Sequence, residues 1–161
     1  MHRIRFLLVL AVAAALALAG VTGAAPLPDF TLATDKGTLR LASLRGKVVY
    51  LDYWASWCAP CRQSFPWMGE MQSRYAGKGL VIVAVNVDRD AADARRFLEQ
   101  IPAAFTIAYD PEGKTAEALA LKGMPTSFLI DRQGEIVATH VGFRESRKAA
   151  MEDEIRALLA R

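Results

Sequence analysis

The most informative part of the sequence runs Val48-Val49-Tyr50-Leu51-Asp52-Tyr53-Trp54-Ala55-Ser56-Trp57-Cys58-Ala59-Pro60-Cys61 and contains the chain's only two cysteines. It begins as an apolar run of strand length, and a helix is predicted from about Cys58 to Tyr75. Pro66 should kink this helix, and Gly77 should end it. Two thiols at this spacing on a strand-to-helix turn can close a small ring, and the start of a helix stabilises a thiolate. Disulfide exchange is therefore the predicted chemistry.

A metal site is the main alternative for a pair of cysteines. A structural zinc site needs about four nitrogen, sulfur or oxygen ligands, but the chain has no second cysteine pair. Its two histidines are His2, near the N-terminus, and His140, far along the chain. We therefore predict neither a bound metal nor another cofactor.

The N-terminus has the pattern of a secretory signal. A basic segment with Arg3 and Arg5 is followed by an uninterrupted apolar run over residues 6–19 and by small residues up to Ala25. No cysteine stands directly after the apolar run, which excludes a lipoprotein anchor. Counted through Ala25, the apolar segment approaches the ~20 residues of a membrane span. We expect residues 1–25 to be a signal peptide or an uncleaved N-terminal membrane anchor, and the protein to be exported to the periplasm.

About 135 residues follow this leader, a size that suits one domain with its own core. We assign residues 26–161 to this domain. The formal net charge is only +3, and no basic run interleaved with aromatic residues suggests nucleic-acid binding. We expect a monomer that binds no nucleic acid and meets the membrane only through an uncleaved anchor.

Strands and helices alternate along the rest of the chain. Residues 27–32 and 38–41 alternate in polarity around a turn and predict a hairpin. The apolar runs over 48–53 and 80–87 are each followed by a helical segment, which is typical of βαβ units with a parallel sheet. Further predicted elements are helices over 91–100, 116–121 and 147–159 and strands over 127–130 and 136–141, the two strands being joined by a hairpin turn at 131–134.

Several short motifs stand in a specific order and at specific separations. They are Asp52 to Cys61, Phe65-Pro66, Val85-Asn86-Val87-Asp88, Gly123-Met124-Pro125-Thr126 and Asp131-Arg132-Gln133-Gly134. Together they resemble the thioredoxin superfamily, specifically the exported TlpA-like and ResA-like disulfide reductases, over essentially all of residues 27–161. The resemblance implies an α/β thioredoxin fold, in which helices flank a central mixed β-sheet, with an N-terminal β-hairpin and a central αβ insertion. It also implies a reductase of other proteins' disulfides, often in c-type cytochrome maturation, that is recharged by a transmembrane thiol donor of the DsbD or CcdA type.

The two cysteines have different predicted roles. Cys58 stands where unpaired backbone N–H groups and the helix macrodipole favour an anion, so its thiolate should attack a substrate disulfide. Cys61, one turn inward, should resolve the mixed disulfide. Ala59 and Pro60 shape the active-site backbone, because proline fixes the first turn of the helix. Ala59 offers no charge to Cys58, whereas oxidases of the DsbA type place a histidine inside the CxxC, so a reductase is favoured and an oxidase is the alternative.

Asp52 interrupts the apolar strand and matches the buried aspartate of thioredoxins, six residues before the first cysteine. Burial would raise its pKa and let it accept the proton of Cys61. The alternative is a solvated acid on an edge strand, because the polarity pattern does not settle which face Asp52 occupies. ResA-like proteins carry asparagine at this position and glutamate at the position of Ser64, and the nearby lysine of thioredoxin falls at Ala84. Asp52 is therefore expected to lack a counter-charge.

A second part of the predicted site comes from Met124-Pro125-Thr126, which resembles the segment that holds a cis-proline opposite the cysteines of thioredoxins. A cis bond would leave the Met124 backbone free to pair with an extended substrate. Trp57 should support the thiol surface as an aromatic contact. The expected partners are proteins that contain disulfides. His140 is interpreted as a strand residue without chemistry, and a copper chaperone of this class would use a wider CxxxC.

Other functional classes fit less well. A peroxiredoxin shares the early hairpin, but its peroxidatic cysteine lies in a Pro-x-x-x-Thr-x-x-Cys setting that is absent here. A non-enzymatic binding module would use the surface of Trp57, Phe65 and Met124 and would not need the cysteines. A redox protein that assembles metal sites stays open, because the thiols of a copper site and those of an apocytochrome form similar disulfides.

Overall fold

A computed structural model describes residues 25–161, so the predicted leader up to residue 24 lies outside the described residues. None of the helices within this range has the length and apolar content needed to cross a bilayer. The strands are β1 (Ala25–Pro26), β2 (Thr31–Thr34), β3 (Gly37–Arg40), β4 (Val48–Trp54), β5 (Leu80–Asn86), β6 (Thr106–Tyr109), β7 (Thr126–Ile130) and β8 (Glu135–Val141). The helices are α1 (Ala59–Tyr75), α2 (Ala91–Gln100), α3 (Lys114–Ala118) and α4 (Lys148–Leu159), with short 3-10 turns η1 (Leu41–Leu44), η2 (Ala76–Lys78) and η3 (Glu145–Arg147).

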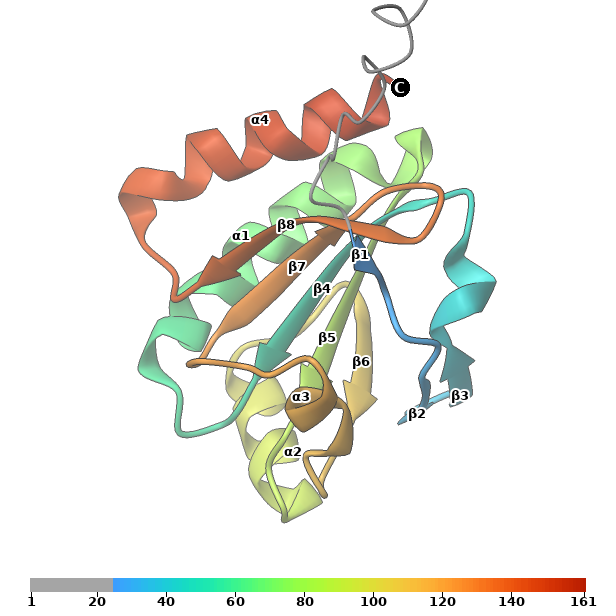
Figure 1. Ribbon diagram of the computed structural model, residues 1–161. Coiled ribbons are helices and arrows are strands. Elements are labelled where there is room, and N and C mark those ends of the chain that lie inside the picture. The colour runs from blue at the N-terminus through green and yellow to red at the C-terminus, as the bar shows by residue number, and fades with distance from the viewer. Residues whose placement is uncertain (1–24) are drawn as a thin grey trace, which may run out of the picture.

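The strands form one mixed eight-stranded sheet in the order β1-β8-β7-β4-β5-β6-β2-β3 (Figure 1). β4 lies near its centre, parallel to β5 and antiparallel to β7, and every residue of β4 is buried. A strand of this kind needs a packed layer on each face of the sheet. Tyr50, Trp54 and other even-numbered residues of β4 face a core shared with α1, α2 and α4, and the odd-numbered residues face a core shared with α3 and η1.

The first helix spans the predicted residues, but a different glycine closes it. α1 starts at Ala59 and continues through Pro66 to Tyr75. Pro66 lies on the exposed side of the helix, where water can satisfy the carbonyl oxygen that proline leaves without a partner. The prediction that Gly77 ends the helix is wrong, because the chain continues through η2 and Gly79 takes the left-handed conformation that closes it, with φ 99°.

The predicted N-terminal hairpin is present as β2 and β3. The segment before it does not extend β2 as far back as Leu27. Ala25 and Pro26 pair instead with β8, and the Leu27 N–H donates to the carbonyl oxygen of Gly134. Pro28 has no N–H to give to a sheet ladder, which accounts for the break between β1 and β2.

The segment between β5 and β7 holds the predicted central αβ insertion, formed by α2 and β6, followed by α3. β6 was absent from the predicted elements, because four residues without a strong alternation give little signal. α3 begins at Lys114 rather than at Ala116. The reason is Asp110, whose carboxylate accepts the backbone N–H groups of Lys114, Thr115 and Ala116 and so fixes the first turn.

One edge of the sheet gathers the ends of four strands. Trp54 at the end of β4 pairs with Asn86 at the end of β5. Tyr53 pairs with Thr126 at the start of β7, and Thr126 pairs with Val141 at the end of β8. We call this side of the sheet the exit edge, defined by Trp54, Asn86, Thr126 and Val141. The loops that leave or enter the sheet here are therefore neighbours.

The two ends of the described chain lie at the opposite side of the sheet. Ala25 pairs with Ile136, close to the turn between β7 and β8. Arg132 in that turn donates to the carbonyl oxygen of Leu159 at 3.4 Å, near the C-terminus. Figure 1 shows the C-terminus and the start of β1 on the same side of the molecule, away from the loop that follows β4.

Candidate active site

Cys58 and Cys61 form a disulfide directly after the exit edge. Cys58 is the N-cap residue of α1, and its sulfur accepts the backbone N–H of Cys61 at 3.2 Å. Pro60 lies in the first turn, where the missing N–H leaves no intrahelical bond unmade. A sulfur in this position receives both a hydrogen bond and the positive end of the helix dipole. The arrangement therefore favours a thiolate at Cys58 when the disulfide is reduced.

The surface at the disulfide is dominated by Trp57. The Trp57 side chain is 70% exposed, whereas Cys58 is 3% exposed and Cys61 is fully buried. Ala59 is exposed and Pro60 is half-buried. An approaching group therefore meets Trp57 and Ala59 first and can touch Cys58, while Cys61 is covered by the protein.

Asp52 lies on the face of β4 that also carries Tyr50 and Trp54, in the layer that contains both cysteines. The alternative of a solvated acid on an edge strand is wrong, since β4 is flanked by β5 and β7 and Asp52 is 1% exposed. Burial raises the pKa of Asp52 well above its usual value. Its Oδ2 atom has no hydrogen-bond partner within the described residues, and Ala84 is its neighbour on β5. No cation among residues 25–161 offsets the cost of ionising Asp52.

The segment before β7 completes the site on the other side. The peptide bond between Met124 and Pro125 is cis, which confirms the expectation. The Pro125 carbonyl oxygen accepts the Gly142 N–H at 2.7 Å, and the Thr126 hydroxyl donates to the Gly123 carbonyl oxygen at 2.7 Å. These bonds tie the proline segment to the end of β8. Pro125 and Thr126 are buried and Met124 is half-buried.

A buried carboxylate that the sequence reading did not single out holds the loop before the cysteines. Asp88 is 6% exposed and accepts the Ser56 backbone N–H at 2.9 Å and the Ser56 hydroxyl at 3.1 Å. It also accepts the side-chain amide of Asn86 at 2.8 Å. Asp88 appeared among the quoted motifs without a role. Its position just beyond an apolar strand at the exit edge is the signal that could have identified it.

His140 is buried and belongs to a polar group away from the disulfide. Its Nε2 atom lies 2.8 Å from a Glu154 carboxylate oxygen, and its Nδ1 atom lies 3.3 Å from the Arg147 guanidinium. Because a guanidinium can only donate, Nδ1 must accept and Nε2 carries the hydrogen that is given to Glu154. These contacts satisfy the polar atoms of a buried strand residue.

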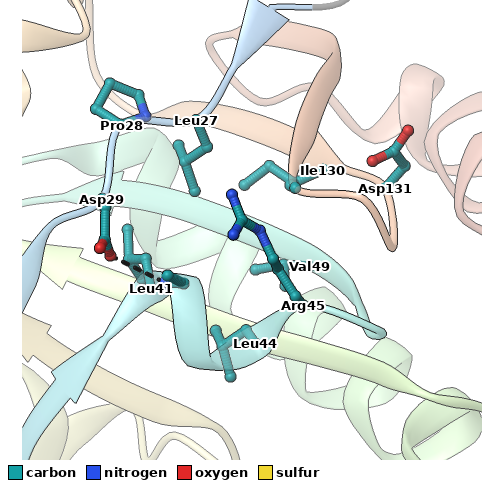
Figure 2. A pocket seen from close by; sticks show the side chains of 11 residues that line it. Leu27, Pro28, Asp29, Leu41, Leu44, Arg45, Val49, Ile130 and Asp131 are labelled. Atoms are coloured by element: carbon teal, nitrogen blue, oxygen red, sulfur yellow. Dashed lines mark hydrogen bonds between the residues drawn. The ribbon is translucent and has the colours of Figure 1, made fainter.

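The cavities of the molecule lie away from the disulfide. A cavity of about 30 Å³ lies between the N-terminal segment, η1 and the turn after β7. Its walls include Leu27, Val49 and Ile130 (Figure 2). A site for a small organic ligand usually has a volume of about 300–1,000 Å³, so this cavity is too small for one. An open hollow of about 1120 Å³ is lined by Leu39, Gln72 and Phe105 and includes none of the site residues. Within residues 25–161, no three His, Cys, Asp or Glu side chains are grouped so that they could hold a metal ion.

Comparison with known proteins agrees with this geometry. The Redoxin family model matches residues 22–159. The chain is 33% identical over 126 residues to a thiol-disulfide oxidoreductase ResA of Bacillus cereus, covering 78% of this chain and 72% of that protein. It is 38% identical over 110 residues to ResA of Geobacillus kaustophilus, covering 68% of this chain and 63% of that protein.

Solved structures show the same likeness. A Chlorobium tepidum protein assigned as thiol:disulfide interchange protein DsbE superposes with a TM-score of 0.83 at 54% sequence identity, covering 84% of this chain and 96% of that one. The exposed lipoprotein thioredoxin Etrx1 of Streptococcus pneumoniae superposes with a TM-score of 0.71 at 33% identity, covering 81% of this chain and 100% of that one. With its disulfide at the N-cap of α1 and its mixed sheet flanked by helices, the chain belongs to the Redoxin family and is a TlpA/ResA-like thiol-disulfide oxidoreductase of the thioredoxin superfamily.

Proposed function

We propose that the protein is an exported protein-disulfide reductase that acts in the periplasm. Cys58 is the attacking thiol, Cys61 the resolving thiol and Asp52 the proton acceptor. Trp57, Met124, Pro125 and Thr126 form the surface that receives the substrate chain. A transmembrane dithiol carrier of the DsbD or CcdA type restores the reduced form. Maturation of c-type cytochromes is the pathway that the family resemblance suggests.

The reaction divides into two exchanges. The Cys58 thiolate attacks one sulfur of a substrate disulfide, and the other substrate sulfur leaves as a thiolate that takes up a proton. Cys61 then gives its proton to Asp52 and attacks the Cys58 sulfur, which releases the second substrate sulfur as a thiolate. This thiolate takes up a proton, and Asp52 returns its own proton to the solvent. Two electrons pass to the substrate, and the protein ends with the Cys58–Cys61 disulfide. A donor dithiol, oxidised to its own disulfide, returns two electrons and two protons.

The Cys58–Cys61 disulfide at the N-cap of α1 is the observation that carries the proposed exchange. The burial of Asp52 without an ionic partner supports its role as proton acceptor. A carboxylate held in an apolar layer has a raised pKa and binds a proton more strongly than an exposed one. Cys61 is fully buried in the same layer, so water has little access to its thiol. Asp52 is therefore the group best suited to take the Cys61 proton.

The direction of electron flow is tested by the reduction potential. Ala59 and Pro60 give Cys58 no charged neighbour, so its pKa should lie near the ~7 of thioredoxin, and the potential should lie nearer ~−270 mV than ~−120 mV. Equilibration with glutathione, read by alkylation of free thiols, measures it. Ala59→His supplies the histidine of an oxidase and should make the potential more oxidising. A wild-type potential above about −150 mV would show that the protein is an oxidase.

The physiological substrate can be identified by trapping its mixed disulfide with the protein. Cys61→Ser removes the resolving thiol, so the mixed disulfide on Cys58 should accumulate in the periplasm. Cys58→Ser is the matched control, because it keeps one thiol but removes the attacking one. Equal capture by both variants would contradict the assigned roles of the two cysteines.

A further inference from the structure

We propose that the disulfide lies at the centre of a basic docking surface that selects substrates with acidic residues beside their cysteines. The inference rests on the proposed reductase function and adds a substrate class to it. The surface consists of an apolar centre formed by Trp57 and Val141 and a basic rim formed by Arg62, Arg89, Lys122 and Arg144.

The apolar centre is unusual for this molecule. Only Trp57, Val137 and Val141 are exposed among the large hydrophobic side chains of residues 25–161, at 70%, 38% and 52%. Trp57 directly precedes Cys58. Val141 ends β8 opposite Thr126, next to the cis-proline, so both side chains lie at the exit edge. Exposed apolar side chains beside a reactive site can supply contact area to a bound partner.

The basic rim follows from the loops that meet at the exit edge. Arg62 comes directly after Cys61. Arg89 follows Asp88, whose carboxylate holds Ser56 in the loop before the cysteines. Lys122 lies two residues before Met124.

Arg144 completes the rim, because it lies two residues beyond Gly142, whose N–H donates to the Pro125 carbonyl oxygen. The four rim side chains belong to exposed residues. In the part of the chain that the structure describes, none of the four forms an ion pair.

The acidic residues of the same loops offset part of the charge of the rim. Asp88 is buried, and its carboxylate accepts hydrogen bonds from Ser56 and Asn86. Asp90 caps α2 through the Ala92 N–H at 2.8 Å, and Glu145 pairs with Lys148 at 2.7 Å. Glu117 on α3 is the remaining exposed acid in the segment that leads to Lys122. Among the described residues, these loops therefore present the four exposed cations of the rim against two exposed acids without an ion pair, Asp90 and Glu117.

The occupant that fits this surface is a polypeptide with an apolar residue and Asp or Glu side chains close to its disulfide. A single exposed ion pair contributes little free energy. Several like charges around one site act together on encounter and can raise association rates by ~10 to 10³-fold, an effect that salt removes. The rim should therefore change which disulfides are reduced fastest rather than whether they are reduced.

Three cystine peptides with the same apolar core test this inference, one flanked by Asp, one by Ser and one by Lys. The readout is the rate constant of reduction by the reduced protein at low and high ionic strength. At low ionic strength we expect the Asp peptide to react about tenfold faster than the Ser peptide, and the Lys peptide more slowly than both. At about 1 M salt, where charges are screened within ~3 Å, the three rates should converge.

Two variants with the same change in net charge make the test specific. Arg89→Ser, Lys122→Ser and Arg144→Ser together remove most of the rim and should bring the Asp-to-Ser rate ratio close to one. Arg62 is kept, because it stacks on Phe97 and donates to Gln100 at 2.7 Å. The remote variant Lys36→Ser, Lys47→Ser and Arg161→Ser should keep the wild-type ratio.

The outcomes separate this inference from the function on which it rests. If no peptide is reduced, the reductase proposal fails. If all three are reduced at equal rates, or if the remote variant loses the preference as fully as the rim variant, the docking surface is refuted. Loss of binding to phosphatidylserine vesicles in the rim variant, with the peptide ratios unchanged, would assign the four cations to a membrane surface and also overturn the inference.

Discussion

The carboxyl group of Asp52 is buried in the middle of the sheet, and burial raises its pKa well above the usual 3.8. Between about that value and the raised pKa, the folded protein binds more protons than the unfolded chain, so the free energy of unfolding should fall as pH increases. Asp52→Asn removes this dependence. We therefore expect the stability of the variant relative to wild type to increase with pH across this window.

Urea melts of wild type and Asp52→Asn at several pH values measure this difference. The same variant should resolve mixed disulfides ~10² to 10⁴-fold more slowly, the range lost when a general base is removed. The first attack by Cys58 should remain, because the N-cap position of its sulfur does not depend on Asp52. Parallel pH profiles and equal resolution rates in both proteins would mean that the Cys61 proton leaves by another route.

Asp88 acts on the geometry of the site. Asp88→Ala would leave the buried Asn86 amide and the Ser56 N–H without their acceptor, which costs about 1–3 kcal/mol for a buried group. The loop that carries Trp57 should also loosen, so attack by Cys58 should slow. Ser56→Ala is the control, because it removes only the hydroxyl bond at 3.1 Å and keeps the backbone bond. In urea melts, Asp88→Ala should have a lower free energy of unfolding than Ser56→Ala, and it should also reduce peptides more slowly. Equal effects of the two substitutions would be inconsistent with a positioning role for Asp88.

Among the elements, α3 depends most on one side chain. The Asp110 carboxylate accepts three backbone N–H groups of its first turn and the Thr115 hydroxyl, at 2.6 Å. Asp110→Ala should therefore lower the free energy of unfolding by about 0.5–2 kcal/mol, the cost of losing a helix cap, or by more because several donors lose their partner. Denaturant melts report this loss. An unchanged midpoint would show that packing against the sheet holds α3 without the cap.

The elements also show what the sequence can predict. β4, β5 and α1 are long and have a strong apolar pattern, so their existence and order follow from the sequence. β6 and the start of α3 do not, because β6 is short and the first turn of α3 is set by an acid four residues before it. Gly79 replaced Gly77 as the helix terminator for a similar reason, since both glycines suit a stop and only the backbone conformation distinguishes them.

At the scale of the whole molecule, the sequence predicts those parts of the candidate site in which a single motif carries the chemistry. The cysteines, Pro125 and Asp52 were all named from motifs. The face of the sheet that Asp52 occupies could not be predicted, because a central strand buried on both sides shows no alternation of polar and apolar residues. The contacts of Asp88 with Ser56 and of Gly142 with Pro125 could not be predicted from the sequence either. Both depend on strand registers, of β4 with β5 and of β7 with β8, that bring together residues far apart in the chain.

The position of the two chain ends has a consequence for how the protein is displayed. Both ends of the described chain lie opposite the exit edge. A chain held at either end, by an uncleaved leader or by a support to which it is coupled, would therefore turn its disulfide outward, into the compartment that contains its partners. Two proteins held side by side on one surface would present their reactive sulfurs in the same direction. They would thus be disposed to meet diffusing substrates more readily than to oxidise each other.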